Sequence, residues 1–163
     1  MTAFSAEWLQ LREGADQAAR NSEIANAVSA RFALRDAISV VDLGCGTGAN
    51  LRATASLLPN RQLWRLIDSD PALLDAARID LIRWADTALR EGDELILRKG
   101  HADIRVSFSQ LDLATDIERA FDGAPALITA SALFDLVSET FIKTIARLCT
   151  ERNNGKHCSY WRT

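Results

Sequence analysis

Residues 40–51, VVDLGCGTGANL, constrain the fold of this chain more than any other segment. A short apolar run ends in Asp42, and Gly44, Gly46 and Gly48 follow at alternate positions before a helix-like segment. Glycine adopts positive φ angles without strain and lets a ligand approach the backbone closely. The following helix would add unpaired N–H groups and the positive end of its dipole. Three such glycines after an acid indicate a strand–loop–helix binding turn rather than a merely tight connection.

The rest of the chain alternates between strand-like and helix-like patterns. We expect strands at 39–43, 62–67, 95–97, 104–108 and 126–130, and helices at 47–58, 71–91, 115–121 and 138–149, with two more helices within 5–32. Lys99-Gly100-His101 predicts a hairpin between two of the strands. Alternation of this kind favours an α/β fold with a parallel sheet and helices on both faces. Ligands of such sheets bind at the carboxyl ends of the strands.

Composition indicates a globular domain and limits its partners. The chain has 163 residues, 48% hydrophobic and 25% charged, with net charge −3, which supports one domain with a core of its own. The acidic balance predicts no binding to nucleic acid or to a membrane surface, and no apolar run is long enough for a transmembrane helix. Three cysteines without CxxC spacing, and an N-terminus unlike a signal peptide, favour a cytoplasmic location and predict no metal site.

Two classes of ligand fit the glycine loop. Gly44-x-Gly46-x-x-Ala49 satisfies the loose dinucleotide fingerprint, which would make the chain part of an NAD-dependent oxidoreductase. Asp42 and the acids at neighbouring strand ends argue against a diphosphate, because carboxylates suit a ligand with cationic groups and free hydroxyls. The oxidoreductase is kept as the alternative.

VDLGCGTG resembles motif I of the class I S-adenosylmethionine-dependent methyltransferases. The resemblance covers roughly residues 38–150 and implies a Rossmann-like, doubly wound, mostly parallel sheet in three α/β/α layers. It also implies S-adenosylmethionine as the cofactor and in-line methyl transfer, with a small-molecule acceptor favoured. Nucleic-acid amino methyltransferases carry an acidic residue or asparagine at the corresponding position, followed by Pro-Pro and an aromatic residue. This chain has Thr129-Ala130-Ser131-Ala132-Leu133 there instead. A nucleic-acid acceptor is therefore not expected.

The resemblance assigns roles to residues beyond the loop. Asp68 is implied to hold both ribose hydroxyls, since a carboxylate can accept two hydrogen bonds from a cis-diol. Asp112 is implied to accept the adenine amino group, and Leu113 to contact the adenine ring. Taken alone, Asp68 could be only a helix cap, and Asp112 a solvated turn residue. The expected cofactor-binding set is Asp42, Gly44, Cys45, Gly46, Gly48, Asp68, Ser69, Asp112, Leu113 and Arg20.

No catalytic residue is assigned. Asp135 is the acid nearest the expected position of the methyl group, but a capping or solvated role is favoured for it. Cys45 is expected to contact the cofactor through its backbone rather than to act as a nucleophile, and His101 and His157 have no expected role. In-line transfer from a sulfonium gains much of its rate from alignment and desolvation, so it needs no strong base.

We expect three regions: an N-terminal helical lid at 1–36, a cofactor-binding core at 37–150 and an aberrant or disordered tail at 151–163. In the lid, Arg12, Asp16 and Arg20 lie on one helix face, which is either solvated or brings Arg20 or Arg12 to the methionine carboxylate.

The tail departs from the pattern of the family, whose sheet has seven strands. The chain leaves no length for the last strands, which predicts a C-terminally truncated methyltransferase or a catalytically incomplete, nucleoside-binding fragment. A shifted reading frame of HCSYWR would encode an apolar strand, which predicts a frameshift. Without the next strand, residues 126–130 would form an open edge that is prone to dimerisation or aggregation.

Overall fold

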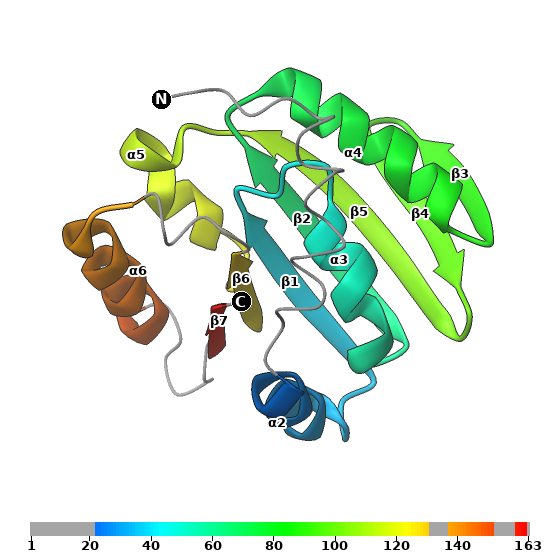
Figure 1. Ribbon diagram of the computed structural model, residues 1–163, viewed down its shortest axis with the longest axis horizontal. Coiled ribbons are helices and arrows are strands. Elements are labelled where there is room, and N and C mark those ends of the chain that lie inside the picture. The colour runs from blue at the N-terminus through cyan, green and yellow to red at the C-terminus, as the bar shows by residue number, and fades with distance from the viewer. Residues whose placement is uncertain (1–21, 131–136, 152–158, 163) are drawn as a thin grey trace.

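A sheet with the strand order β3-β4-β5-β2-β1-β6-β7 runs through the protein (Figure 1). This computed structural model describes residues 22–130 and 137–151, and the backbone of 159–162. The strands are β1 (Ala37–Leu43), β2 (Arg61–Asp68), β3 (Thr87–Glu91), β4 (Glu94–Lys99), β5 (Ala102–Gln110), β6 (Leu127–Ala130) and β7 (Ser159–Arg162). Along this order, β5, β2, β1, β6 and β7 each run parallel to the next strand. The pairs β3–β4 and β4–β5 are antiparallel. The expected mostly parallel sheet is confirmed.

Helices pack against both faces of this sheet (Figure 1). One layer holds α2 (Ser22–Phe32), α3 (Ala49–Thr54) with the 3₁₀ turn η1 (Ala55–Leu57), and α4 (Pro71–Trp84). The other holds α5 (Leu113–Asp116), the 3₁₀ helix η2 (Ile117–Phe121) and α6 (Glu139–Glu151). The three-layer Rossmann-like architecture is therefore confirmed. None of the helices in the described ranges has the length and apolar character needed to cross a bilayer.

The central strands carry buried apolar residues on both faces, because helices pack on both sides of the sheet. In β2, Trp64 and Leu66 point into the core under α2, α3 and α4, while Ile67 points into the core under η2 and α6. Two buried polar side chains on this strand, Trp64 and Gln62, have hydrogen-bond partners, as burial favours, whereas the buried Nε of Arg65 has none among the described residues. Trp64 Nε1 donates to Gln62 Oε1 at 2.8 Å, and Gln62 Nε2 donates to the Ala55 carbonyl at 2.7 Å. These bonds fix η1 against the sheet.

Helix α4 begins as expected but ends earlier than the sequence suggested. Asp70 is its N-cap and accepts a hydrogen bond from Ala72 N at 2.8 Å, with Pro71 in the first turn. The predicted extension of the helix up to Gly92 was wrong, because the helix ends at Trp84 and residues 87–91 form β3. Ala88, expected on the buried stripe of the helix, lies on an exposed strand.

Contacts from distant residues explain this early end. Asp86 Oδ1 accepts from Lys99 Nζ and Oδ2 from Gly100 N, both at 2.8 Å, and Asp86 N donates to the Arg98 carbonyl at 2.8 Å. These bonds turn the chain into β3 beside β4. The predicted hairpin at Lys99-Gly100-His101 is confirmed, since Lys99 pairs with Ala102.

The C-terminal residues also differ from expectation. Strand β7 pairs in parallel with β6, from Leu127 opposite Ser159 to Ala130 opposite Arg162. The prediction of an open edge at 126–130 was therefore wrong, and the last residues supply a strand where an aberrant tail was expected. The three expected regions stay a prediction. Within the first of them only residues from 22 onward are described, and these form the second of the two expected N-terminal helices.

The core under α4 generates the first prediction. Leu81 is fully buried, whereas its neighbour Ile82 is 46% exposed on the same helix. Leu81→Ala removes apolar contacts and leaves a cavity, so we expect a loss of about 2–5 kcal/mol in the free energy of unfolding. Ile82→Ala, the control, should cost less than about 1 kcal/mol. Urea denaturation of both variants measures the difference, and equal losses would contradict this packing.

Candidate functional site

Asp42, the last polar residue of β1, is the buried centre of this region. Its side chain is fully buried, and Oδ1 accepts hydrogen bonds from Asn50 Nδ2 and Thr129 Oγ1, both at 2.9 Å. Asn50 Nδ2 also donates to Thr129 Oγ1 at 2.9 Å. The three side chains connect β1, α3 and β6. The carboxyl ends of two strands and the first turn of the following helix are therefore held together by one polar network.

The loop between β1 and α3 has the backbone that its glycines predict. Gly44, Gly46 and Gly48 have φ angles of 64°, 53° and 76°, in the left-handed region. At Gly48 a Cβ atom would lie 3.6 Å from its nearest neighbours, which is ordinary contact. The backbone angle, and not lack of space, therefore requires glycine there. Cys45 N donates to the Ile67 carbonyl at 2.9 Å, which anchors the loop to β2.

Asp68 connects the end of β2 to this loop. It is 9% exposed, and its Oδ2 accepts a hydrogen bond from Gly46 N at 2.9 Å. Its Oδ1 accepts from Asp70 N at 3.0 Å. Because Asp70 caps α4, the alternative of Asp68 as the helix N-cap is wrong. The structure instead brings the acid of β2 directly beside the glycine loop of β1.

Cys45 lies between the two acids and is 7% exposed. Burial is the main cause that raises the pKa of its thiol well above the ordinary value, and the negative charges of Asp42 and Asp68 raise it further. The thiol is therefore neutral at physiological pH. A neutral, buried thiol is a poor nucleophile.

The other predicted contacts lie at the end of β5, next to Asp68. Leu111 N donates to the Asp68 carbonyl at 3.0 Å, and Gln110 Nε2 donates to the Ser69 carbonyl at 3.2 Å. Asp112 is exposed and is the N-cap of α5, where its Oδ1 accepts from Ala114 N at 2.9 Å. The fold thus places residues 68–69 and 110–112 side by side, at the same end of the sheet as the glycine loop.

Several predicted residues cannot be placed in this arrangement. Arg12, Asp16, Arg20, Asp135 and His157 lie outside the described residues. Leu113 is half-buried against the core under α6. His101 lies in the turn before β5, at the opposite end of that strand from Asp112. In the described part of the chain, no three His, Cys, Asp or Glu side chains are grouped to hold a metal ion.

Sequence reasoning missed Asn50 as a member of the site and noted Thr129 only as a departure from the pattern of nucleic-acid amino methyltransferases. Both are almost fully buried, with 1% exposure each. A buried polar side chain needs partners, so an asparagine on the inward face of the first helical turn was the available signal. Its pairing with Thr129, 79 residues away, had no local signal.

No protein-family model matches the chain, and no curated protein matches its sequence. Solved structures match its fold. A Methanococcus maripaludis protein assigned as an S-adenosyl-L-methionine-dependent methyltransferase is 19% identical, with a TM-score of 0.57, over 91% of this chain and 60% of that one. Magnesium protoporphyrin IX methyltransferase from Synechocystis, solved with bound S-adenosylmethionine, is 16% identical, with a TM-score of 0.54, over 92% of this chain and 60% of that one.

A Burkholderia thailandensis O-methyltransferase family protein is 18% identical, with a TM-score of 0.55, over 88% of this chain and 35% of that one. The chain thus spans at most about 60% of the length of these three proteins. At such low identity the likeness shows the fold alone. The chain has the Rossmann-like α/β fold of the S-adenosylmethionine-dependent methyltransferases.

Proposed function

We propose that this chain binds S-adenosylmethionine and transfers its methyl group to a small-molecule acceptor. The observation that carries the proposal is the contact between Asp68 and Gly46. It places an acid from the end of β2 against a loop of three left-handed glycines at the end of β1. Ligands of parallel α/β sheets bind at this edge. A carboxylate beside a glycine-rich loop suits a nucleoside with free hydroxyls.

The residues present fit this cofactor. Each oxygen of a carboxylate can accept two hydrogen bonds, and each oxygen of Asp68 accepts one from the backbone. Two acceptor positions therefore remain for the two hydroxyls of a ribose. The backbone bonds also fix the carboxylate in advance, which reduces the entropy lost on binding. The glycine loop leaves the backbone beside it open to close approach.

In this proposal Gly44, Gly46 and Asp68 hold the cofactor, with Ser69, Asp112 and Leu113 on the adenine side and Arg20 at the methionine carboxylate. Asp42 is fully buried, so we assign it an indirect role: through Asn50 and Thr129 it fixes the loop that contacts the cofactor. Bound there, S-adenosylmethionine supplies an electrophilic methyl group on a sulfonium. The chain supplies alignment and exclusion of water.

A small-molecule acceptor in the cytoplasm agrees with the remaining observations. The net charge of −3 gives no general attraction to nucleic acid. Cys45 of the glycine loop is buried and forms no disulfide, as suits a reducing compartment. One protein of the same fold, the Synechocystis enzyme, is named for a small-molecule substrate.

Calorimetry with S-adenosylhomocysteine tests the proposal. Asp68→Asn removes the charge that would accept the ribose hydroxyls, and hydrogen bonds to charged groups contribute about 1.5–3 kcal/mol. We expect binding to the variant to weaken roughly ten- to a hundredfold. The control Asp75→Asn changes an acid on α4 that is 74% exposed, and binding should not change. Tighter binding of NAD than of S-adenosylhomocysteine would instead support the oxidoreductase alternative.

Two alanine variants separate the backbone requirement of the loop from its role in binding. Gly46 and Gly123 both have positive φ, 53° and 83°, but Gly123 lies far from the loop and has open space around it. Each alanine variant should lose roughly 1–2 kcal/mol in the free energy of unfolding, because a Cβ atom is strained at these angles. Only Gly46→Ala should also weaken S-adenosylhomocysteine binding. Equal affinities of the two variants would remove the loop from the proposed site.

The raised pKa of Cys45 predicts a pH dependence of stability. Its folded pKa lies above the unfolded value of about 8.5, so the native chain keeps a proton that the unfolded chain releases at alkaline pH. This contribution to stability is fully present below that value and is lost as the pH rises above it. Urea denaturation between pH 7.5 and 10 should show a steeper loss for the natural chain than for Cys45→Ala. Identical slopes would indicate an unshifted thiol.

A further inference from the structure

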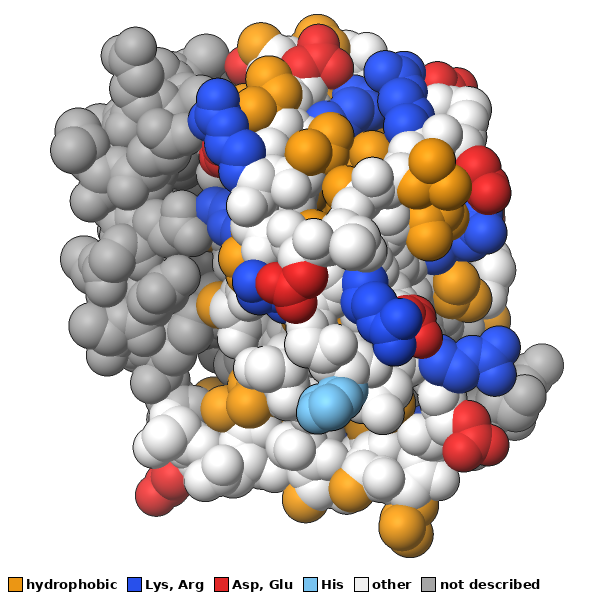
Figure 2. Space-filling model, turned by 90° about the vertical axis from the view of Figure 1, so that its right-hand side faces the viewer, with side chains coloured by type: hydrophobic (Ala, Val, Ile, Leu, Met, Phe, Trp, Pro, Cys, Tyr) orange, Lys and Arg blue, Asp and Glu red, His pale blue; other side chains and the backbone are white. Residues whose placement is uncertain are grey.

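Strand β3 forms the outer edge of the sheet, beyond β4 (Figure 1). All five of its residues, Thr87–Glu91, are exposed, and the side chain of Leu89 is 60% exposed. Among the strands that the structure describes, β3 pairs only with β4. The outer backbone groups of such an edge are a template for pairing with another strand. Figure 2, viewed from this side, shows hydrophobic side chains in separate groups among charged ones.

An apolar row leads to this edge on the sheet face opposite α4. Leu89 of β3 lies opposite Ile96 of β4. Ile96 in turn lies opposite Arg105 of β5, and Arg105 lies opposite Leu63 of β2. Directly opposite residues in a sheet point to the same face. Leu63 is 53% exposed, so the described helices of this layer do not cover the row. Leu89 is the end of the row at the edge of the molecule.

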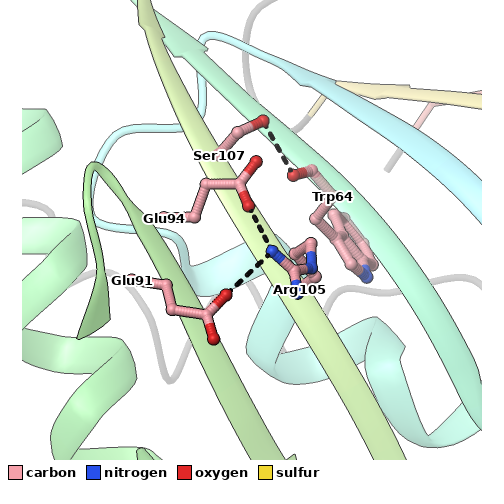
Figure 3. Close-up of polar contacts among 5 residues, drawn as sticks. All are labelled: Trp64, Glu91, Glu94, Arg105 and Ser107. Carbon is pink, nitrogen blue, oxygen red and sulfur yellow. Dashed lines mark hydrogen bonds and ion pairs between the residues drawn. The ribbon is translucent and has the colours of Figure 1, made fainter. Parts of the chain in front are cut away.

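Charged side chains of opposite sign lie on the two sides of this row. On one side lie Glu94 and Glu91, which contact Nη1 of Arg105, the one charged member of the row, at 2.6 Å and 3.3 Å, so two carboxylates share one guanidinium (Figure 3). On the other side Thr87 lies opposite Arg98, whose Nε is 3.7 Å from Asp103. At the edge itself, Glu91 therefore lies at one end of β3, and Arg98 lies behind Thr87 at the other end, where it is also paired with Asp103.

We propose that β3 pairs antiparallel with β3 of a second copy of this chain, with Leu89 opposite Leu89 at the two-fold axis. In this register Thr87 lies opposite Glu91 of the second copy and Ala88 lies opposite Arg90. No charged residue faces a like charge, and Arg98 lies next beyond Thr87, on the side of the second copy's Glu91. The apolar rows of the two copies join at the axis.

Other registers that keep the same faces together are poorer. A register centred on Arg90 sets two guanidinium groups opposite each other, which destabilises a strand pair. A register centred on Ala88 pairs only three residues of each strand. The register centred on Leu89 pairs all five. An edge of this length buries less area than the roughly 1,200–2,000 Å² of a stable interface, so the dimer should form in a concentration-dependent way.

Self-crosslinking tests the register. Under the proposal, an oxidant such as copper phenanthroline joins two copies of Leu89→Cys by a disulfide, because opposite Cβ atoms in such a pair are close. The control Leu34→Cys places a thiol at a fully exposed residue just after α2, away from the hairpin, and its two copies should not be joined by a disulfide. Both variants carry Cys158→Ser, since Cys45 and Cys149 are buried. Equal crosslinking of both variants would overturn the register.

Sedimentation velocity over a concentration series tests the association itself. The natural chain should shift from monomer to dimer as its concentration rises, as should the control Leu34→Lys. Leu89→Lys sets two ammonium groups against each other at the axis and should remain monomeric. Because residue 89 is exposed, this variant should keep the unfolding temperature of the natural chain. A natural chain that stays monomeric throughout, or a Leu89→Lys variant that dimerises as the control does, overturns the proposal.

Discussion

The buried carboxylate of Asp42 is the constraint on which the carboxyl end of the central strands depends. A fully buried charge is costly unless hydrogen bonds satisfy it, and here Asn50 and Thr129 donate to one of its oxygens. These partners come from the helix after the glycine loop and from the strand on the other side of β1. Any separation of α3 or β6 from β1 would remove a donor from the carboxylate. The loop between Asp42 and Asn50 must therefore turn tightly, and its left-handed glycines permit that turn.

The contact between Gly46 and Asp68 makes two sequence features into one unit. The donor is a backbone N–H in the loop and the acceptor is a side chain 22 residues later. The conformation of the loop and the orientation of the acid therefore depend on each other. A substitution that changes either one alters both the shape and the charge offered to a ligand. The glycine loop after β1 and Asp68 at the end of β2 therefore have to be considered as one structural unit.

The sequence predicted the parts of the fold that depend on local chemistry. The strand–loop–helix turn follows from the glycines, and the start of α4 follows from the cap at Asp70 before a proline. The sequence failed where distant contacts decide. Residues 87–91 contain Ala, Leu, Arg and Glu, all good helix formers, yet pairing with β4 and the bonds of Asp86 to Lys99 and Gly100 make them a strand. The link from Asn50 to Thr129 was hidden for the same reason.

The extra hairpin moves one edge of the sheet away from the candidate site. Between β3 and β2, which carries Asp68, there are three strand spacings of about 4.8 Å, or roughly 14 Å. A strand added at β3 extends the sheet sideways, while a ligand at Asp68 binds beyond the carboxyl end of β2. The two surfaces therefore point in different directions and share no described residue. The proposed association through β3 thus leaves the glycine loop and Asp68 open, so that it and the proposed cofactor binding would be independent of each other.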